Sequence, residues 1–347
     1  MFARANNAVR IAAVFRPRAQ VAIAGQPVWR ACAYSTAPAS AADTATAAKS
    51  PLSAIQYCRD LVRKYDHEHY LCGLLYPAHL RNGYWALRAF FIELSAVREA
   101  VSDPRIGQMR LQFWRDAVDS TFKGHPPQHP VTVALSQTVL AHSTGEGAVR
   151  PLVSSSWMKR IINEREKDME DPYHATMESL EAYVEAAHAS AMYLQLELLG
   201  VRSVSADHIA SHIGKAYGLV TLLRATPFHA SKRRTYLPAA LLAEHGVSQE
   251  DLFRNGPTAE GLHDVVYDVA SVAHRHLEVA KDHWVDDRHR KDVPSHAFTA
   301  MLAAIPARTY LDRLQQVHFN VFDPKLTVRP WKLPWTLYMA NRRRKFS

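Results

Sequence analysis

The chain has 347 residues, of which 48% are hydrophobic and 22% are charged. This composition predicts a packed globular core, and every apolar run is shorter than a membrane-spanning helix requires. The formal net charge is +9. No nucleic-acid-binding motif occurs, and the charge is compatible with an anionic membrane surface or an acidic partner.

Residues 1–48 form an arginine-rich leader. Its first 42 residues contain no Asp or Glu, and its five arginines stand in an Ala-rich background: Arg4, Arg10, Arg16, Arg18 and Arg30. This pattern is typical of a mitochondrial transit peptide, and the alternative is a disordered tail that carries no address. Without the leader the formal charge would fall to +5, because five arginines and Asp43 would leave.

From Pro51 onward the dominant spacing of apolar residues is helical. Ile55, Cys58 and Val62 recur at steps of three and four, which places them on one face of a helix. Strand-like alternation is nearly absent, so the sequence predicts one all-α domain over residues 51–320. Helices within it are expected roughly at 84–94, 106–122, 130–142, 152–170, 177–199, 206–224, 248–254, 260–284, 295–304 and 307–317.

Several chemically reactive side chains in this domain are expected to be structural. Cys58 and Cys72 are isolated in the sequence, which indicates buried thiols rather than a disulfide or a zinc site. The charged run at 164–168 is typical of a solvated helix face. His208 and His212 share a helix face, but without a glutamate of the zinc-protease type they predict no metal site.

Residues 321–347 form a tail of different character. Trp331, Trp335 and Tyr338 are followed by a basic cluster at 342–345. Aromatic residues beside cations suit a membrane–water interface. The alternative is an apolar strap that packs on the domain and ends in solvated charges. In either reading the tail is an accessory to the helical domain.

Several segments carry the signatures of a known family. The clearest is Leu222-Leu223-Arg224, followed by Arg234 and by Tyr236-Leu237-Pro238. It resembles the second signature of the squalene/phytoene synthases. The segments at 85–90 (Trp-Ala-Leu-Arg-Ala-Phe), 111–116 and 129–135 are similar to further parts of that family, and they occur in the family's order.

The resemblance implies an all-α, isoprenoid-synthase-like fold, with a single helical domain around a central cavity. In that family two aspartate-rich helix faces hold Mg²⁺, and the metal ions grip an isoprenyl diphosphate. The chemistry needs carboxylates because Mg²⁺ prefers oxygen ligands and neutralises the charge that develops on the leaving group.

Both acidic motifs are degenerate at the matching positions. Alignment on the first signature places the first carboxylate pair at Ser95 and Glu99, and alignment on the second signature places the other pair at Ala225 and His229. Residues 208–243 contain no Asp or Glu, and Pro227 is expected to disturb the helix there. The resemblance therefore implies a catalytically inactive protein with no metal site and no cofactor.

Cations instead occupy the region of the second motif. Arginine can hold a phosphate or a carboxylate directly, which makes this region a candidate anion-binding site, with a solvated loop as the equal alternative. The candidate residues are Arg224, Lys232, Arg233, Arg234 and Tyr236.

The chain most closely resembles one branch of the family, the mitochondrial complex I assembly factors. Segments that carry this likeness include 106–114 and 245–251. The resemblance implies a peripheral protein on the matrix side of the inner mitochondrial membrane. Its partners would be complex I subunits and assembly intermediates, at the stage of an early membrane-arm core subunit.

Two rival functions remain open at this point. The first is an active prenyl-diphosphate transferase whose non-standard metal site is built on Glu93, Glu99 and distant acids. The second is a carrier that keeps the apolar cavity and binds an isoprenoid or another lipid without turnover.

Overall fold

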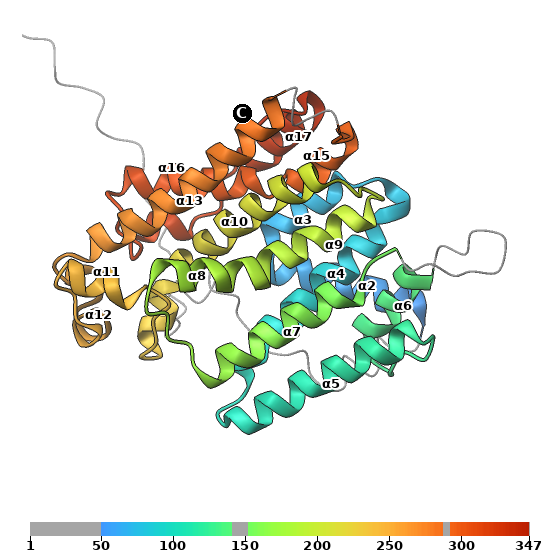
Figure 1. Ribbon diagram of the computed structural model, residues 1–347, viewed down its shortest axis with the longest axis horizontal. Helices are drawn as coiled ribbons and strands as arrows, with labels where there is room; N and C mark the ends of the chain where they lie inside the picture. Colours follow the sequence, from blue (N-terminus) through green and yellow to red (C-terminus); the bar gives the residue numbers. More distant parts are fainter. Residues whose placement is uncertain (1–49, 141–151, 287–291, 347) are drawn as a thin grey trace, which may run out of the picture.

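The computed structural model describes residues 50–140, 152–286 and 292–346, and every regular element in these ranges is helical (Figure 1). The predicted leader at 1–48 lies outside the described residues. Hydrophobic residues from all parts of the domain form one continuous core, which agrees with the expected all-α domain.

The helices follow one another with short connections. The first half contains α2 (Pro51–Tyr65), α3 (His67–Leu74), α4 (Ala78–Ala96), η2 (Arg98–Ala100), α5 (Pro104–Phe122), α6 (Pro130–Leu140), α7 (Ser155–Glu170), α8 (Met177–Val184), the π-helix η3 (Glu185–Ala189) and α9 (Ser190–Leu198). The second half contains α10 (Val204–Ser231), α11 (Ala239–Glu244), α12 (Gln249–Asn255), η4 (Gly256–Thr258), α13 (Leu262–Val285), η5 (Ser295–Ala297), α15 (Phe298–Met301), α16 (Ala304–Gln316), η6 (Pro324–Thr327) and α17 (Leu333–Arg343).

The long helix α10 runs through the middle of the molecule, between α13 and α9 (Figure 1). Its first turn is capped by the Ser203 side chain, which accepts a hydrogen bond from the backbone N–H of Ala206. Such a cap satisfies one of the unpaired donors at a helix start. Fifteen residues of α10 are buried, so the helix acts as the axis around which the others pack.

Gly214 allows α10 to touch its neighbour at the level of the backbone. A Cβ atom at this position would lie 2.5 Å from Cα of Ala189. Ala189 ends the π-helix, a single wide turn of the kind that often lies at functional sites. The turn also carries His188, which lines a pocket beside α10. The expected helix at 177–199 is therefore interrupted where it meets α10.

A buried ionic group joins α3 to α4. Asp66 accepts hydrogen bonds from Arg88 Nε at 3.1 Å and pairs with His69 Nδ1 at 3.0 Å, and all three residues are less than 5% exposed. Burial raises the pKa of the Asp66 carboxyl, but the charges and hydrogen bonds of Arg88 and His69 outweigh it and hold this pKa far below its usual range. Asp66 is therefore ionised in the core.

Two expectations for helices and thiols have clear outcomes. Pro227 does not end the helix, because α10 continues through this proline to Ser231. Ala225 and Thr226, which precede the proline, are buried, and their packing helps to hold the helix despite the lost N–H. Cys58 and Cys72 are both buried and free, as expected for structural thiols.

The tail packs on the domain along one side. Leu333, Leu337 and Ala340 of α17 are buried, and Trp284 Nε1 of α13 donates to the Arg344 carbonyl at 2.8 Å. The inner side of the tail thus packs on the domain, as the apolar-strap alternative predicted. Among the described helices, none has the length and apolar character to cross a membrane.

We predict that Gly214→Ala lowers the free energy of unfolding by about 1–3 kcal/mol, because the added methyl group overlaps the Ala189 backbone and forces α10 away from the π-helix. Urea unfolding followed by circular dichroism measures the change. Ser205→Ala, on the half-exposed first turn of α10, is the control and should unfold like the wild type. Equal stability of the two variants would contradict the proposed close contact.

Candidate functional site

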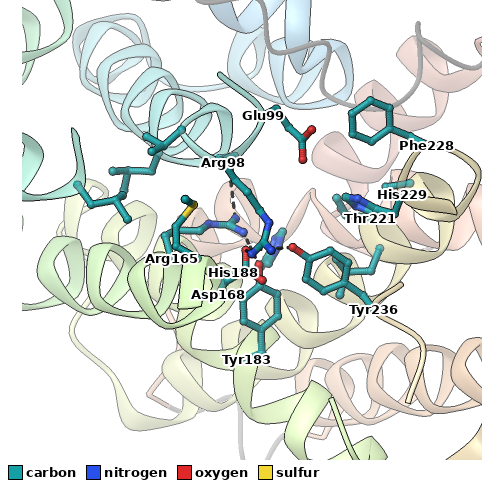
Figure 2. Close-up of a pocket in the computed structure, with 17 residues that line it drawn as sticks. Arg98, Glu99, Arg165, Asp168, Tyr183, His188, Thr221, Phe228, His229 and Tyr236 are labelled. Carbon is teal, nitrogen blue, oxygen red and sulfur yellow. Dashed lines mark hydrogen bonds and ion pairs between the residues drawn. The ribbon is translucent and has the colours of Figure 1, made fainter. Parts of the chain in front are cut away.

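A pocket of about 80 Å³ opens beside the middle of α10. We call it the first pocket. Helices from distant parts of the chain contribute its polar lining (Figure 2). Those side chains are Ser95, Arg98, Glu99, Arg165, Asp168, Tyr183, His188, Thr221, His229 and Tyr236. The pocket thus brings together all four positions of the two degenerate acidic motifs, since Ala225 also lines it.

Asp168 is the most deeply buried carboxylate of the first pocket. It is 5% exposed, and its Oδ2 lies 3.2 Å from Arg98 Nη1 and accepts a hydrogen bond from Tyr236 Oη at 3.0 Å. Burial and the nearby Asp168 charge raise the pKa of the Tyr236 hydroxyl well above its usual value. Tyr236 is therefore a neutral donor, and Asp168, its acceptor, also forms an ion pair with Arg98 (Figure 2).

The other carboxylate of the first pocket is also paired. Glu99 Oε1 lies 2.6 Å from Arg234 Nη2, a bond that ties the loop after α10 to η2. Ser95 donates to the Phe91 carbonyl at 2.9 Å and accepts from Arg165 Nη2 at 3.1 Å. Arginines therefore contact the side chains at both positions of the first degenerate motif.

The second degenerate motif brings no negative charge to the first pocket. Ala225 presents a buried methyl group. His229 has its pKa lowered to about 3, first by burial and then by the charges of Arg234 and Arg98. The imidazole is therefore neutral near pH 7, and it packs against the Tyr236 ring with centroids 4.7 Å apart.

A second pocket, of about 210 Å³, lies next to the first along α10 and shares Thr221 and Ala225 with it. Arg224 spans it and donates to Glu68 through two bonds of 2.9 and 3.1 Å. Its guanidinium also lies over the Tyr310 ring. Such a bidentate pair fixes the arginine in one orientation.

The five candidate anion-binding residues do not meet in one place. Arg224 lines the second pocket, Tyr236 lines the first, and Arg234 pairs with Glu99 of the first pocket. Lys232 and Arg233 are exposed beyond the end of α10, and Arg233 pairs with Glu250 at 2.5 Å. Anion binding by these residues stays a prediction, and it would have to use separate subsets.

The acids of the proposed non-standard metal site are also separated. Glu93 accepts a hydrogen bond from Tyr57 at 3.0 Å and does not line the first pocket, whereas Glu99 does. Across residues 50–140, 152–286 and 292–346, no group of three or more His, Cys, Asp or Glu side chains is placed to hold a metal ion. His208 and His212 therefore belong to no such group, although they lie beside His276 and His283 between α10 and α13.

Sequence reasoning missed one wall of the first pocket. The run at 164–168 was expected to be a solvated helix face, and this was wrong for Arg165 and Asp168, which point into the pocket (Figure 2). A signal was present, because both residues continue the stripe of Met158, Ile161 and Ile162, which are fully buried. The helical phase of the apolar residues predicts burial here better than the density of charge does.

The sequence is similar to those of known proteins over most of its length. A model of the squalene/phytoene synthase family matches residues 62–336. A mouse protein named NADH dehydrogenase (ubiquinone) complex I, assembly factor 6, is 43% identical over 290 residues, which cover 84% of this chain and 82% of the relative. A 15-cis-phytoene synthase from Synechococcus elongatus is 23% identical over 306 residues, covering 84% of this chain and 93% of that protein.

The fold also has a counterpart among solved structures. A crystal structure of a dehydrosqualene synthase in complex with ligand superposes with a TM-score of 0.69 and 19% sequence identity, covering 85% of this chain and 97% of that chain. This likeness shows the fold alone. It confirms the expected all-α isoprenoid-synthase architecture.

We predict that His229 makes the protein less stable in mild acid. The unfolded chain binds a proton at this residue below about pH 6.5, whereas the folded chain does not until its lowered pKa of about 3 is reached. The folded state therefore loses stability as the pH falls from 6.5. His229→Gln should reduce the loss between about pH 7 and pH 5 by about 2 kcal/mol.

Urea unfolding at the two pH values measures this difference. His263→Gln, at an exposed position of α13, is the control and should keep the pH dependence of the wild type. If His229→Gln also keeps it, the imidazole is protonated in the folded protein.

Proposed function

The chain belongs to the squalene/phytoene synthase family, and we propose that it is a catalytically inactive member that acts in the assembly of mitochondrial respiratory complex I. The proposal has two parts, absence of catalysis and a role in assembly. They rest on different observations and are tested separately.

Absence of catalysis is supported by the pairing of the two acids in the first pocket. Glu99 and Asp168 are the only carboxylates among its lining residues, and each lies against an arginine. Mg²⁺ would have to compete with these arginines for the two carboxylates. The positions that match the family's other metal-binding acids hold Ser95, Ala225 and His229, which supply no charge.

The two rival functions receive less support from the geometry. A metal site on Glu93 and Glu99 would need acids that face the same space, and Glu93 is occupied by Tyr57 outside the first pocket. A carrier would need a long apolar cavity. The first pocket has room for only a few water molecules, and the second pocket is lined in part by charged side chains, among them Arg224 and Glu68.

The role in assembly is supported by the relatives. The mouse protein, 43% identical over most of both chains, is named as a complex I assembly factor. The arginine-rich leader agrees with a mitochondrial address. We place the protein on the matrix side of the inner membrane, bound peripherally, where it contacts complex I subunits or assembly intermediates during membrane-arm biogenesis.

We predict that the purified protein releases no diphosphate from farnesyl or geranylgeranyl diphosphate in the presence of Mg²⁺. An assay for inorganic diphosphate, with an active squalene or phytoene synthase as positive control, measures this. Metal-dependent release that exceeds the background without protein would overturn the absence of catalysis, and it would leave the role in assembly open.

We further predict that a strain lacking this protein loses assembled complex I and that Glu99→Gln restores it to the wild-type amount. The amide keeps the shape of the side chain and an oxygen that accepts from Arg234, but it cannot act as a metal-binding carboxylate. Native gel electrophoresis of mitochondrial membranes measures complex I, and Glu93→Gln is the matched control.

Two outcomes would contradict the proposal. Normal complex I in the deletion strain would remove the role in assembly. If the deletion strain loses complex I and Glu99→Gln, present at the wild-type protein level, does not restore it while Glu93→Gln does, the Glu99 carboxylate has a chemical role.

A further inference from the structure

The outer side of the tail carries an aromatic stripe that the domain does not cover. In α17, Leu333 and Leu337 face the core, and Trp335 and Tyr338 lie on the opposite side of the helix. Their side chains are 66% and 43% exposed, and Trp331, just before the helix, is 83% exposed. The Trp335 and Tyr338 rings lie 5.7 Å apart. Three neighbouring aromatic residues thus form one surface patch.

The patch is held rigidly and is not a frayed end. Behind it, Trp284 binds the Arg344 carbonyl, and Phe346 packs against Phe298 with ring centroids 5.0 Å apart. The backbone of the tail is therefore fixed to the core while the aromatic side chains stay in water. An exposed apolar patch on a rigid support is characteristic of an interaction surface.

The charged side chains of the tail after Asp323 have a single sign. After Asp323 the sequence contains no Asp or Glu, and its cations are Lys325, Arg329, Lys332, Arg342, Arg343, Arg344 and Lys345. Arg342 continues the outer stripe one turn beyond Tyr338 and is exposed, as are Arg343 and Lys345. Lys332 lies over the Trp331 ring. A binding partner that matches this patch must therefore offer negative charge beside an apolar layer.

We propose that this face of the tail, which we call the tail face, docks on an anionic lipid bilayer. Tryptophan and tyrosine rings favour the boundary between acyl chains and headgroups, and arginine and lysine side chains reach the phosphates. The inference deepens the proposed function, because it rests on the membrane location given there and names the surface that provides it.

A second exposed apolar stripe is a useful contrast. Ile106, Met109 and Phe113 of α5 are exposed, at the edge of the molecule away from α17 (Figure 1). Acids lie beside this stripe as well, including Asp116 and Glu170. It has exposed apolar side chains without the uniform positive charge, which makes it a matched control for a non-specific hydrophobic contact.

Sedimentation of the full-length protein with vesicles tests the proposal. We expect binding to vesicles of phosphatidylcholine mixed with cardiolipin and little binding to phosphatidylcholine alone. Replacing Arg342, Arg343 and Lys345 by glutamine should weaken binding by about fivefold for each charge removed. Lipids brominated in the acyl chains should quench tryptophan fluorescence, and the double variant Trp331→Phe, Trp335→Phe should lose that quenching.

Two controls locate the contact. Met109→Ser on α5 should bind like the wild type. Replacing the leader residues Arg10, Arg16 and Arg18 by glutamine should also leave the quenching unchanged. Quenching that persists in the double tryptophan variant, or wild-type protein that does not sediment with either vesicle, would overturn the proposal. In the latter outcome the tail face contacts a protein instead, and the role in assembly can still hold, since complex I in cells reports it independently.

Discussion

Charges inside this helical domain are tolerated because each carboxylate in the core or the first pocket lies against a cation. Asp66 lies against Arg88, Asp168 against Arg98 and Glu99 against Arg234. An ion removed from water costs several kcal/mol unless a partner and hydrogen bonds compensate it. Two of these pairs, Asp168–Arg98 and Glu99–Arg234, join elements distant in the sequence, so they fix the relative positions of elements beside the first pocket.

The absence of acids from residues 208–243, which include most of α10, fits this arrangement of charges. A carboxylate at position 225 or 229 would compete with Glu99 for Arg234, or would need a metal ion to offset it. With Ala225 and a neutral His229 in place, the arginines turn to the acids of η2 and α7 instead. The uncharged side chains of α10 and the ion pairs of the facing elements therefore keep the charges in this space balanced.

Much of the fold could be predicted from the sequence, because α5 and α13 bury a regular apolar stripe and end close to the expected residues. The π-helix could not be predicted, since it depends on the contact of Ala189 with Gly214 across the fold. For the site, alignment on the family signatures selected four positions that all line the first pocket. The signatures could not show that Glu99 meets Arg234, 135 residues away, because no local pattern records a pair of that separation. Asp168 was not predicted to be buried. The charged residues around it indicated a solvated face, although its position along the helix indicated burial.

The tail connects the interior of the domain to its outer surface. Leu326 and Leu333 line the second pocket from the inside, and Trp331 lies at its border while most of its side chain is exposed. The same short segment therefore closes a pocket beside α10 and presents the aromatic patch. Because its inner side is anchored in the core, any surface that binds the outer side also sets the orientation of α10 and of both pockets. A tail that was only a tether would give no such control.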